Sequence, residues 1–283
     1  MSNAKELKSI DLSSYTIITT GIAVLFSIIS SIALTIGIGI ISPANIGVSV
    51  YLVSTIVVGT FMYTIYNSFS QGLFYNLLSK KLKTIKIELN NEKEIVRISN
   101  AETATVVALI AAIQAVLIYL ASVFILPLVL NATIQTLVFA NQQMLAYTFY
   151  QFLLLLNQPM TIVFFIFGTF VITFVFVLIG TYIYNFLASK GRAIEVNLSK
   201  DNEMTAIDSI DMMKFAVAMA IIGGVLDLIF AIIMIISGGN AITLLGNVIS
   251  TIIGGFVSAA LIAIFYNFLA PKIGKLKLEL IDQ

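Results

Sequence analysis

The sequence contains no cysteine, no histidine and no tryptophan. Without cysteine there are no disulfides and no thiol chemistry, and without cysteine and histidine the usual ligands of zinc and haem are missing. An active site needs a nucleophile, a base and a group that orients them, and the remaining residues do not supply such a set. We therefore predict that the protein is not an enzyme and that it holds no metal and no cofactor.

Charge is also scarce. Only 10% of the 283 residues are charged and 59% are hydrophobic, whereas a soluble domain has about 25% charged residues. The chain therefore belongs in a membrane, and we expect the lipid bilayer to be its main partner, with no nucleic acid.

Long apolar runs give the membrane prediction its detail. Each run is long enough to cross roughly 30 Å of hydrocarbon as a helix, and the first is too long for the core of a signal peptide, which has roughly 7 to 15 residues. We predict six transmembrane helices in three pairs, at 13–41, 48–78, 103–130, 161–187, 215–236 and 241–269.

The positive charges are distributed unevenly around these runs. All 15 Lys and Arg residues precede the first run, lie between the second and third or the fourth and fifth, begin the fifth, or follow the sixth. Because basic loops stay on the inner side, we expect a multi-pass protein of the cell membrane with both termini cytoplasmic. The three outward loops carry no charge, which suits an acidic exterior, burial against a partner, or chance in short loops.

One phrase occurs three times. Residues 75–89, 184–198 and 266–280 align without a gap, and each begins with Tyr-Asn. We interpret the chain as three repeats, each of a strand, two helices and a strand: 1–90, 91–199 and 200–283. The second repeat differs by an insertion at 131–158.

Each repeated phrase ends in alternating apolar residues, such as Ile85, Ile87 and Leu89. This period of two predicts half-buried strands. Residues 85–98 read as a hairpin that turns at Asn90 to Lys93, and 194–210 as a looser one. If the pattern closes, the strand near Ile10 pairs with the strand near Leu278. The predicted fold is thus a membrane all-α bundle with a small β layer, arranged with pseudo-threefold symmetry.

The phrases Ser-Ile-Asp before one helix and Tyr-Asn-Phe-Leu-Ala-x-Lys-x-Gly-x-Leu-x-Leu-x-Leu after the next resemble a small two-span transmembrane domain family of unknown function. That family is known from actinobacteria, with relatives in archaea. The third repeat, 209–280, matches best, whereas the first has Lys83 in place of the glycine and the second shifts it to Gly191. The resemblance implies three tandem copies and carries no catalytic residues.

The insertion 131–158 is apolar but contains several Asn and Gln residues. It reads as an outward helix in the interface or packed over the spans, and a seventh span is the alternative. Asn131, in Asn-Ala-Thr, matches a glycosylation acceptor on the outward face.

Asp227 is the one charged residue inside a predicted span. Ionisable groups at that depth are costly and are functional candidates. Counting from the repeat starts places Ser27 level with Asp227 and Gln114 one residue away. These three residues could form a polar path for ions or water, or polar contacts between helices.

Other repeated positions have structural interpretations. Small residues on one face let helices approach closely, tyrosines and lysines at span ends anchor helices in the interface, and Asp or Ser before a span caps the helix. Ser99 with Glu102 also reads as a capping box, and the basic cluster at residues 80–86 could hold anionic lipid. The close-packing residues are Gly59, Gly168, Gly246, Ser250 and Gly254; the anchors are Tyr75, Tyr184, Tyr266, Lys81, Lys190 and Lys272; the caps are Asp11, Ser99 and Asp211.

Two functions remain open. The first is a non-enzymatic membrane scaffold or assembly subunit that packs as a pseudo-trimer and with other membrane proteins. The second is a small ion or proton channel or transporter with a central path past Asp227.

Overall fold

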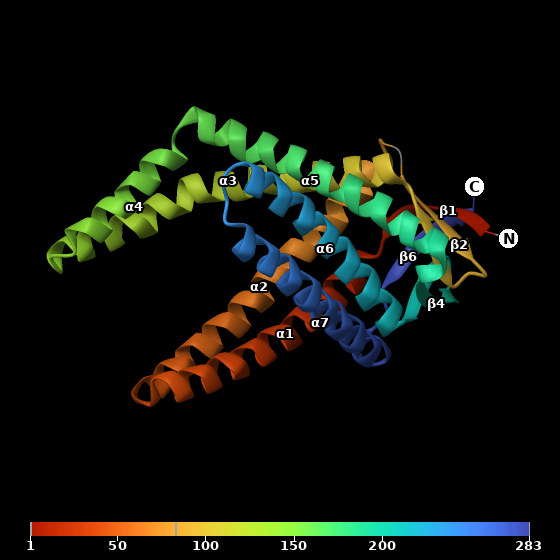
Figure 1. Cartoon of the computed structure of the whole chain (residues 1–283), viewed down its shortest axis with the longest axis horizontal. Coiled ribbons are helices and arrows are strands. Elements are labelled where there is room, and N and C mark those ends of the chain that lie inside the picture. Colours follow the sequence, from red (N-terminus) through yellow and green to blue (C-terminus); the bar gives the residue numbers. More distant parts are fainter. Residues whose placement is uncertain (1, 83, 283) are drawn as a thin grey trace. The chain divides into compact units, whose positions relative to one another are not determined.

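A computed structural model describes residues 2–82 and 84–282. The chain forms two compact units: the first combines residues up to Thr103 with those from Ile179 onward, and the second is Ala104–Leu178. All strands within the described ranges belong to the first unit (Figure 1). They are β1 (Ser2–Ile10), β2 (Ile85–Asn90), β3 (Glu94–Ile98), β4 (Ile194–Asp201), β5 (Met204–Ile210) and β6 (Lys277–Asp282).

These strands form a closed antiparallel barrel in the order β1-β2-β3-β4-β5-β6. The prediction of an all-α membrane bundle with a small β layer is therefore wrong. The hairpin β2–β3 is confirmed and turns through Asn91 and Glu92, both with positive φ. The hairpin β4–β5 is also confirmed, and β1 pairs with β6 so that Ile10 lies opposite Leu278.

The sequence pattern missed the remaining pairings, β1–β2, β3–β4 and β5–β6. Each joins two strands that are separated by helices, so no local turn signals it. These pairings turn separate hairpins into one closed sheet, and a closed barrel has no unpaired edge at which other chains could add.

Alternating residues fill the barrel. Directly opposed residues point to the same face of a sheet, and the register places Leu7 opposite both Ile85 and Leu280. Leu7, Leu89 and Val196 are buried, whereas Arg97 and Asn197 on the other face are exposed. The predicted apolar alternation thus supplies the core of the barrel.

Helices of the first unit adjoin the barrel. They are α1 (Leu12–Ile41), α2 (Ile46–Ser79), α6 (Met212–Ile236) and α7 (Ala241–Ile273), with the short 3₁₀ helix η1 (Pro43–Asn45) between α1 and α2. The π-helical turn η2 (Ala188–Arg192) leads into β4. Helices α1 and α2 pack together, as do α6 and α7, and α1 also contacts α7, where Phe26 and Phe265 meet edge to face with centroids 5.1 Å apart.

The second unit contains most of α3 (Asn100–Phe139) and α5 (Pro159–Leu187), and all of α4 (Gln143–Leu156). Helix α3 continues without interruption through Pro127 and Asn131. The insertion expected at 131–158 is thus divided between the end of α3 and α4. Within this unit the Tyr119 hydroxyl donates to the Leu156 carbonyl at 2.7 Å.

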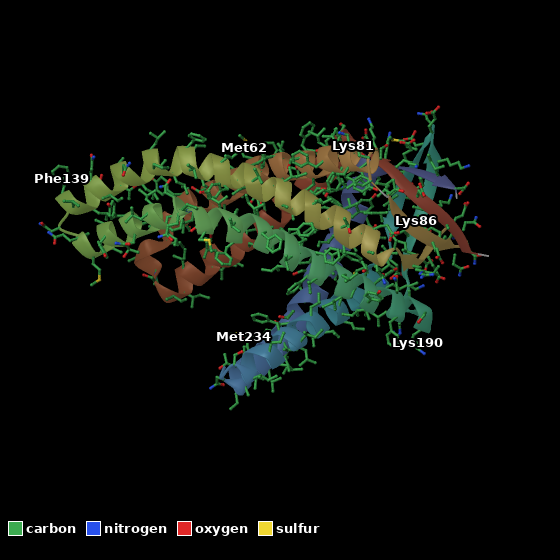
Figure 2. The ribbon with its side chains drawn as sticks, turned by 90° about the horizontal axis from the view of Figure 1, so that it is seen from above. Met62, Lys81, Lys86, Phe139, Lys190 and Met234 are labelled. Atoms are coloured by element: carbon green, nitrogen blue, oxygen red, sulfur yellow. The ribbon has the colours of Figure 1, made fainter. Side chains whose placement is uncertain are left out.

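Six helices of the described chain, α1, α2, α3, α5, α6 and α7, are long and apolar enough to cross a membrane. They suggest a multi-pass membrane protein. In the first unit, nitrogen and oxygen atoms crowd around the barrel and the adjoining helix ends near Lys81, Lys86 and Lys190, whereas Met62 and Met234 lie along helices covered with carbon (Figure 2).

Candidate functional site

The repeated tyrosines lie at the junction between helices and barrel. All three are buried, with 3–4% of their surface exposed. Each hydroxyl donates to the carbonyl of the residue three positions before the end of a strand: Tyr75 to Leu7 at 2.6 Å, Tyr184 to Ile95 at 2.5 Å and Tyr266 to Ile207 at 2.5 Å.

The same hydroxyls also contact the neighbouring strand. The Tyr184 hydroxyl accepts from the Ile194 N–H at 3.2 Å, and the Tyr266 hydroxyl accepts from the Leu276 N–H at 3.3 Å. One tyrosine therefore bridges β3 and β4, and another bridges β5 and the residue that precedes β6. These are among the pairings that the sequence pattern missed.

The asparagine after each tyrosine completes the contact. The Asn267 side chain accepts from the Ile210 N–H and donates to the Ile210 carbonyl, both at 2.9 Å. Asn76 binds Ile10, and Asn185 binds Ile98, in the same way. We call each Tyr-Asn pair with its strand contacts a clamp. From the sequence, no role is predicted for these asparagines, although their repetition after each tyrosine indicates a shared one.

The lysines that follow the clamps are exposed. Lys272 Nζ lies 3.2 Å from the centroid of the Phe268 ring, and Lys190 Nζ lies 5.7 Å from that of Phe186. Both are cation–π contacts. Lys81 lies in the turn after α2.

The residues expected to cap helices divide into two groups. The carboxylates of Asp11 and Asp211 accept from the Ser14 and Lys214 N–H groups, both at 2.7 Å. Ser99 instead contacts β2: its N–H donates to the Lys86 carbonyl at 2.9 Å and its hydroxyl oxygen accepts from the Lys86 N–H at 3.0 Å. In a capping box, the Glu102 side chain would accept from the Ser99 N–H. Because that N–H already donates to the barrel, Ser99 and Glu102 do not form one.

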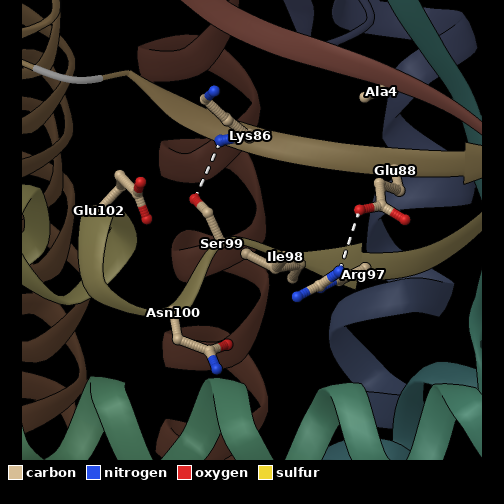
Figure 3. A pocket seen from close by; sticks show the side chains of 8 residues that line it. All are labelled: Ala4, Lys86, Glu88, Arg97, Ile98, Ser99, Asn100 and Glu102. Carbon is tan, nitrogen blue, oxygen red and sulfur yellow. Dashed lines mark hydrogen bonds and ion pairs between the residues drawn. The ribbon is translucent and has the colours of Figure 1, made fainter.

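A pocket of about 390 Å³ opens beside Ser99 (Figure 3). It lies entirely in the first unit, between the strands β1 to β3 and the first turn of α3. Its lining residues are Ala4, Lys86, Glu88, Arg97, Ile98, Ser99, Asn100 and Glu102. From the sequence, Glu102 is predicted only as part of a capping box and Lys86 only as part of the basic cluster at 80–86. The pocket itself forms only when the barrel closes.

Several charged groups elsewhere on the barrel form ion pairs. Lys214 Nζ lies 2.8 Å from Glu195 and 3.2 Å from Glu94. Two hydrogen bonds lower the pKa of Glu94: the larger effect comes from the Asn90 side chain and the smaller from Lys214. The Lys275 ammonium, 2.7 Å from Asp208, and the Ser199 hydroxyl lower the pKa of the Asp208 carboxyl.

The residues of the expected polar path make separate contacts. The Asp227 carboxylate accepts from the Thr251 hydroxyl at 2.8 Å, which joins α6 to α7. Ser27 is buried in α1 and donates to the Val24 carbonyl of its own helix at 2.8 Å. Gln114 is half-buried in the second unit.

The small residues expected at close helix contacts lie in open positions. An added Cβ at Gly59, Gly168, Gly246 or Gly254 would meet nothing within 4 Å, and Ser250 is exposed. The close approach of α6 and α7 occurs at Gly224, where an added Cβ would overlap Ile252 Cγ1. Asn131, the possible glycosylation site, is exposed on α3.

Comparison of the chain with protein-family models, with curated proteins and with solved structures finds no match. The candidate site therefore rests on its own geometry.

Proposed function

We propose that the chain is a non-enzymatic integral membrane scaffold or assembly subunit, which associates with itself or with other membrane proteins and binds anionic lipid near its basic residues. In this proposal the chain is built from three related copies. The clamps support this view, because the same contacts recur at Tyr75, Tyr184 and Tyr266.

The observation that carries the proposal is the placement of polar groups in the helices. Asp227 bonds to Thr251, and the Tyr-Asn pairs bond to strand backbone within the chain. Large apolar side chains, such as Val50 and Ile253, are exposed along the helices. Such a surface suits lipid and neighbouring helices and offers little for chemistry.

The proposed orientation has both termini in the cytoplasm. Pairing of β1 with β6 supports a shared side for the two chain ends, and the positions of Lys and Arg favour the cytoplasmic side. The barrel then lies in the cytoplasm, at the inner membrane surface.

Native mass measurement after purification in mild detergent tests the scaffold proposal. We expect an oligomer or a complex with a copurifying membrane protein, and a lone monomer contradicts it. We place the contact with a second helix at an exposed row on α7, formed by Gly246, Ser250 and Gly254. Leucines there would keep that helix from approaching closely. We expect Gly246→Leu with Gly254→Leu to weaken association, and the exposed pair Ile249→Leu with Ile253→Leu to leave it intact.

A channel or transporter is the second candidate. One observation favours it: the buried hydroxyls of Thr16, Thr20 and Ser31 on α1 have no hydrogen-bond partner within the described residues, and water can occupy such sites. Proton flux into liposomes tests this candidate. It requires flux with the native chain and a clear loss with Asp227→Asn; absent flux, or flux unchanged by the substitution, overturns it.

A further inference from the structure

The pocket beside Ser99 differs from the corresponding place in the next hairpin. Glu102 lies three residues after Ser99, as Lys214 lies three residues after Asp211. Lys214 forms an ion pair with Glu195 of β4, at 2.8 Å. The residue in β2 that aligns with Glu195 is Lys86, so the two charges are exchanged between the hairpins.

The two exchanged charges, Lys86 and Glu102, do not form an ion pair with each other within the described contacts. Lys86 Nζ lies 3.9 Å from Glu6 on β1. Because the Ser99 N–H is held by the Lys86 carbonyl, Glu102 is not drawn back onto the helix end. Its carboxylate is left to line the pocket, as Figure 3 shows.

The pocket therefore presents charges of both signs. Lys86 lies along β2, and Arg97 on β3 pairs with Glu88 at 3.5 Å with two thirds of its side chain exposed. Ammonium and guanidinium groups bind phosphate oxygens. The Ser99 hydroxyl accepts from the Lys86 N–H and can still donate its own proton. A carboxylate such as that of Glu102 can accept hydrogen bonds from the ammonium group of a ligand.

The position of the pocket indicates where its ligand comes from. Asn100 and Glu102 belong to the first turn of α3, a helix long enough to span a membrane. The apolar run predicted to span the membrane begins at residue 103, so in the proposed placement this first turn lies at the depth of the lipid headgroups. A cavity of about 390 Å³ is also within the size range of small-molecule sites, about 300–1,000 Å³.

We propose that this pocket binds a phosphoethanolamine group, with the phosphate held by Lys86 and Arg97 and the primary ammonium held by Glu102. The source is the headgroup of a membrane phospholipid. The inference rests on the proposed membrane placement and adds a zwitterionic lipid to the anionic lipid proposed above: a choline headgroup cannot donate hydrogen bonds to Glu102, and a glycerol headgroup carries no cation.

The test is native mass spectrometry of the full chain with phosphatidylethanolamine, phosphatidylcholine or phosphatidylglycerol added in detergent micelles. We expect the native chain to retain phosphatidylethanolamine about tenfold more tightly than phosphatidylcholine, a difference equivalent to about 1.4 kcal/mol. Glu102→Gln should remove this preference. Lys86→Met with Arg97→Gln should weaken binding of all three lipids, because each of them carries the phosphate.

Matched controls use exposed residues in the hairpin turns. Glu203→Gln and Lys93→Met change the same charges away from the pocket, and both should keep the preference. Equal retention of the three lipids by the native chain, or a preference that survives Glu102→Gln, overturns the proposal.

A second arm separates the lipid from a soluble source. Calorimetry with soluble phosphoethanolamine and with inorganic phosphate should show binding at least about tenfold weaker than that of the lipid, because the acyl chains add contacts. Tighter binding of the soluble compound overturns the assignment to a lipid. The subunit mass is read from the same spectra, so a failure of lipid selectivity is distinguishable from a failure of the scaffold proposal.

Discussion

The side chain of Asn267 pairs with both backbone groups of Ile210, accepting from its N–H and donating to its carbonyl at 2.9 Å. Ile210 ends β5, and α6 begins two residues later. At that point the chain leaves the barrel, and the asparagine supplies the hydrogen bonds that a neighbouring strand would otherwise provide.

Replacing Asn267 with leucine should lower the stability of the barrel. The change leaves two backbone groups of Ile210 without partners, and each unpaired buried group costs about 1–3 kcal/mol. Thermal unfolding in detergent should show a lower midpoint. Asn247→Leu, at an exposed position of the same helix, is the control, and equal midpoints for the two variants contradict the prediction.

Tyr184→Phe should loosen the pairing of β3 with β4. The ring remains, but the Ile95 carbonyl and the Ile194 N–H lose the hydroxyl that bridges them. We expect a loss of about 1–3 kcal/mol and faster hydrogen exchange at the Ile194 amide. Tyr182, two residues earlier, is 59% exposed, so Tyr182→Phe should change neither quantity.

Gly224→Ala should push α6 away from α7, because the new methyl group overlaps Ile252 Cγ1. Isoleucine is branched at Cβ and has little rotamer freedom with which to move aside. Overpacking of this kind costs about 1–3 kcal/mol, measured as a lower unfolding midpoint. Adding Ile252→Ala should recover part of the loss, and Gly254→Ala, which meets no atom within 4 Å, should have little effect.

The barrel should lose stability in acid. Hydrogen bonds from Lys275 and Ser199 hold the folded pKa of Asp208 below its ordinary value, so the ionised carboxylate stabilises the fold above the unfolded pKa of about 3.9. That contribution disappears as the pH falls through the lower folded pKa. The unfolding midpoint should therefore drop as the pH falls below the unfolded pKa of about 3.9, and Asp208→Asn should flatten the drop. If Glu203→Gln flattens it equally, Asp208 is not the cause.

The sequence predicted what depends on neighbours along the chain. Apolar run lengths located the six long apolar helices, and alternation with a turn near Asn91 located the hairpins. The pairing of β1 with β2 could not be predicted this way, since 74 residues separate Ile10 from Ile85 and alternation does not say which strand lies alongside. Backbone ladders join such strands, and the clamp residues add hydrogen bonds beside them.

The same limit applies to the candidate site. A tyrosine where a helix leaves the membrane usually suggests an interface anchor, and only the position of β3 reveals what the Tyr184 hydroxyl bonds to. Ser99 and Glu102 match the pattern of a capping box, but a strand beside Ser99 uses the same N–H group. Sequence reasoning therefore located these residues and missed the partners that come from distant strands.

Cross-linking of the first strand to the last tests the central claim, that the strands close into one barrel within a single chain. Ser9 and Glu279 are paired in the β1–β6 register, and their side chains meet at 2.6 Å. The chain has no native cysteine, so Ser9→Cys with Glu279→Cys provides the sole thiols. We predict rapid disulfide formation within one molecule under mild oxidation, with none for Ser9→Cys with Glu203→Cys; no cross-link, or cross-links only between molecules, would contradict the closed barrel.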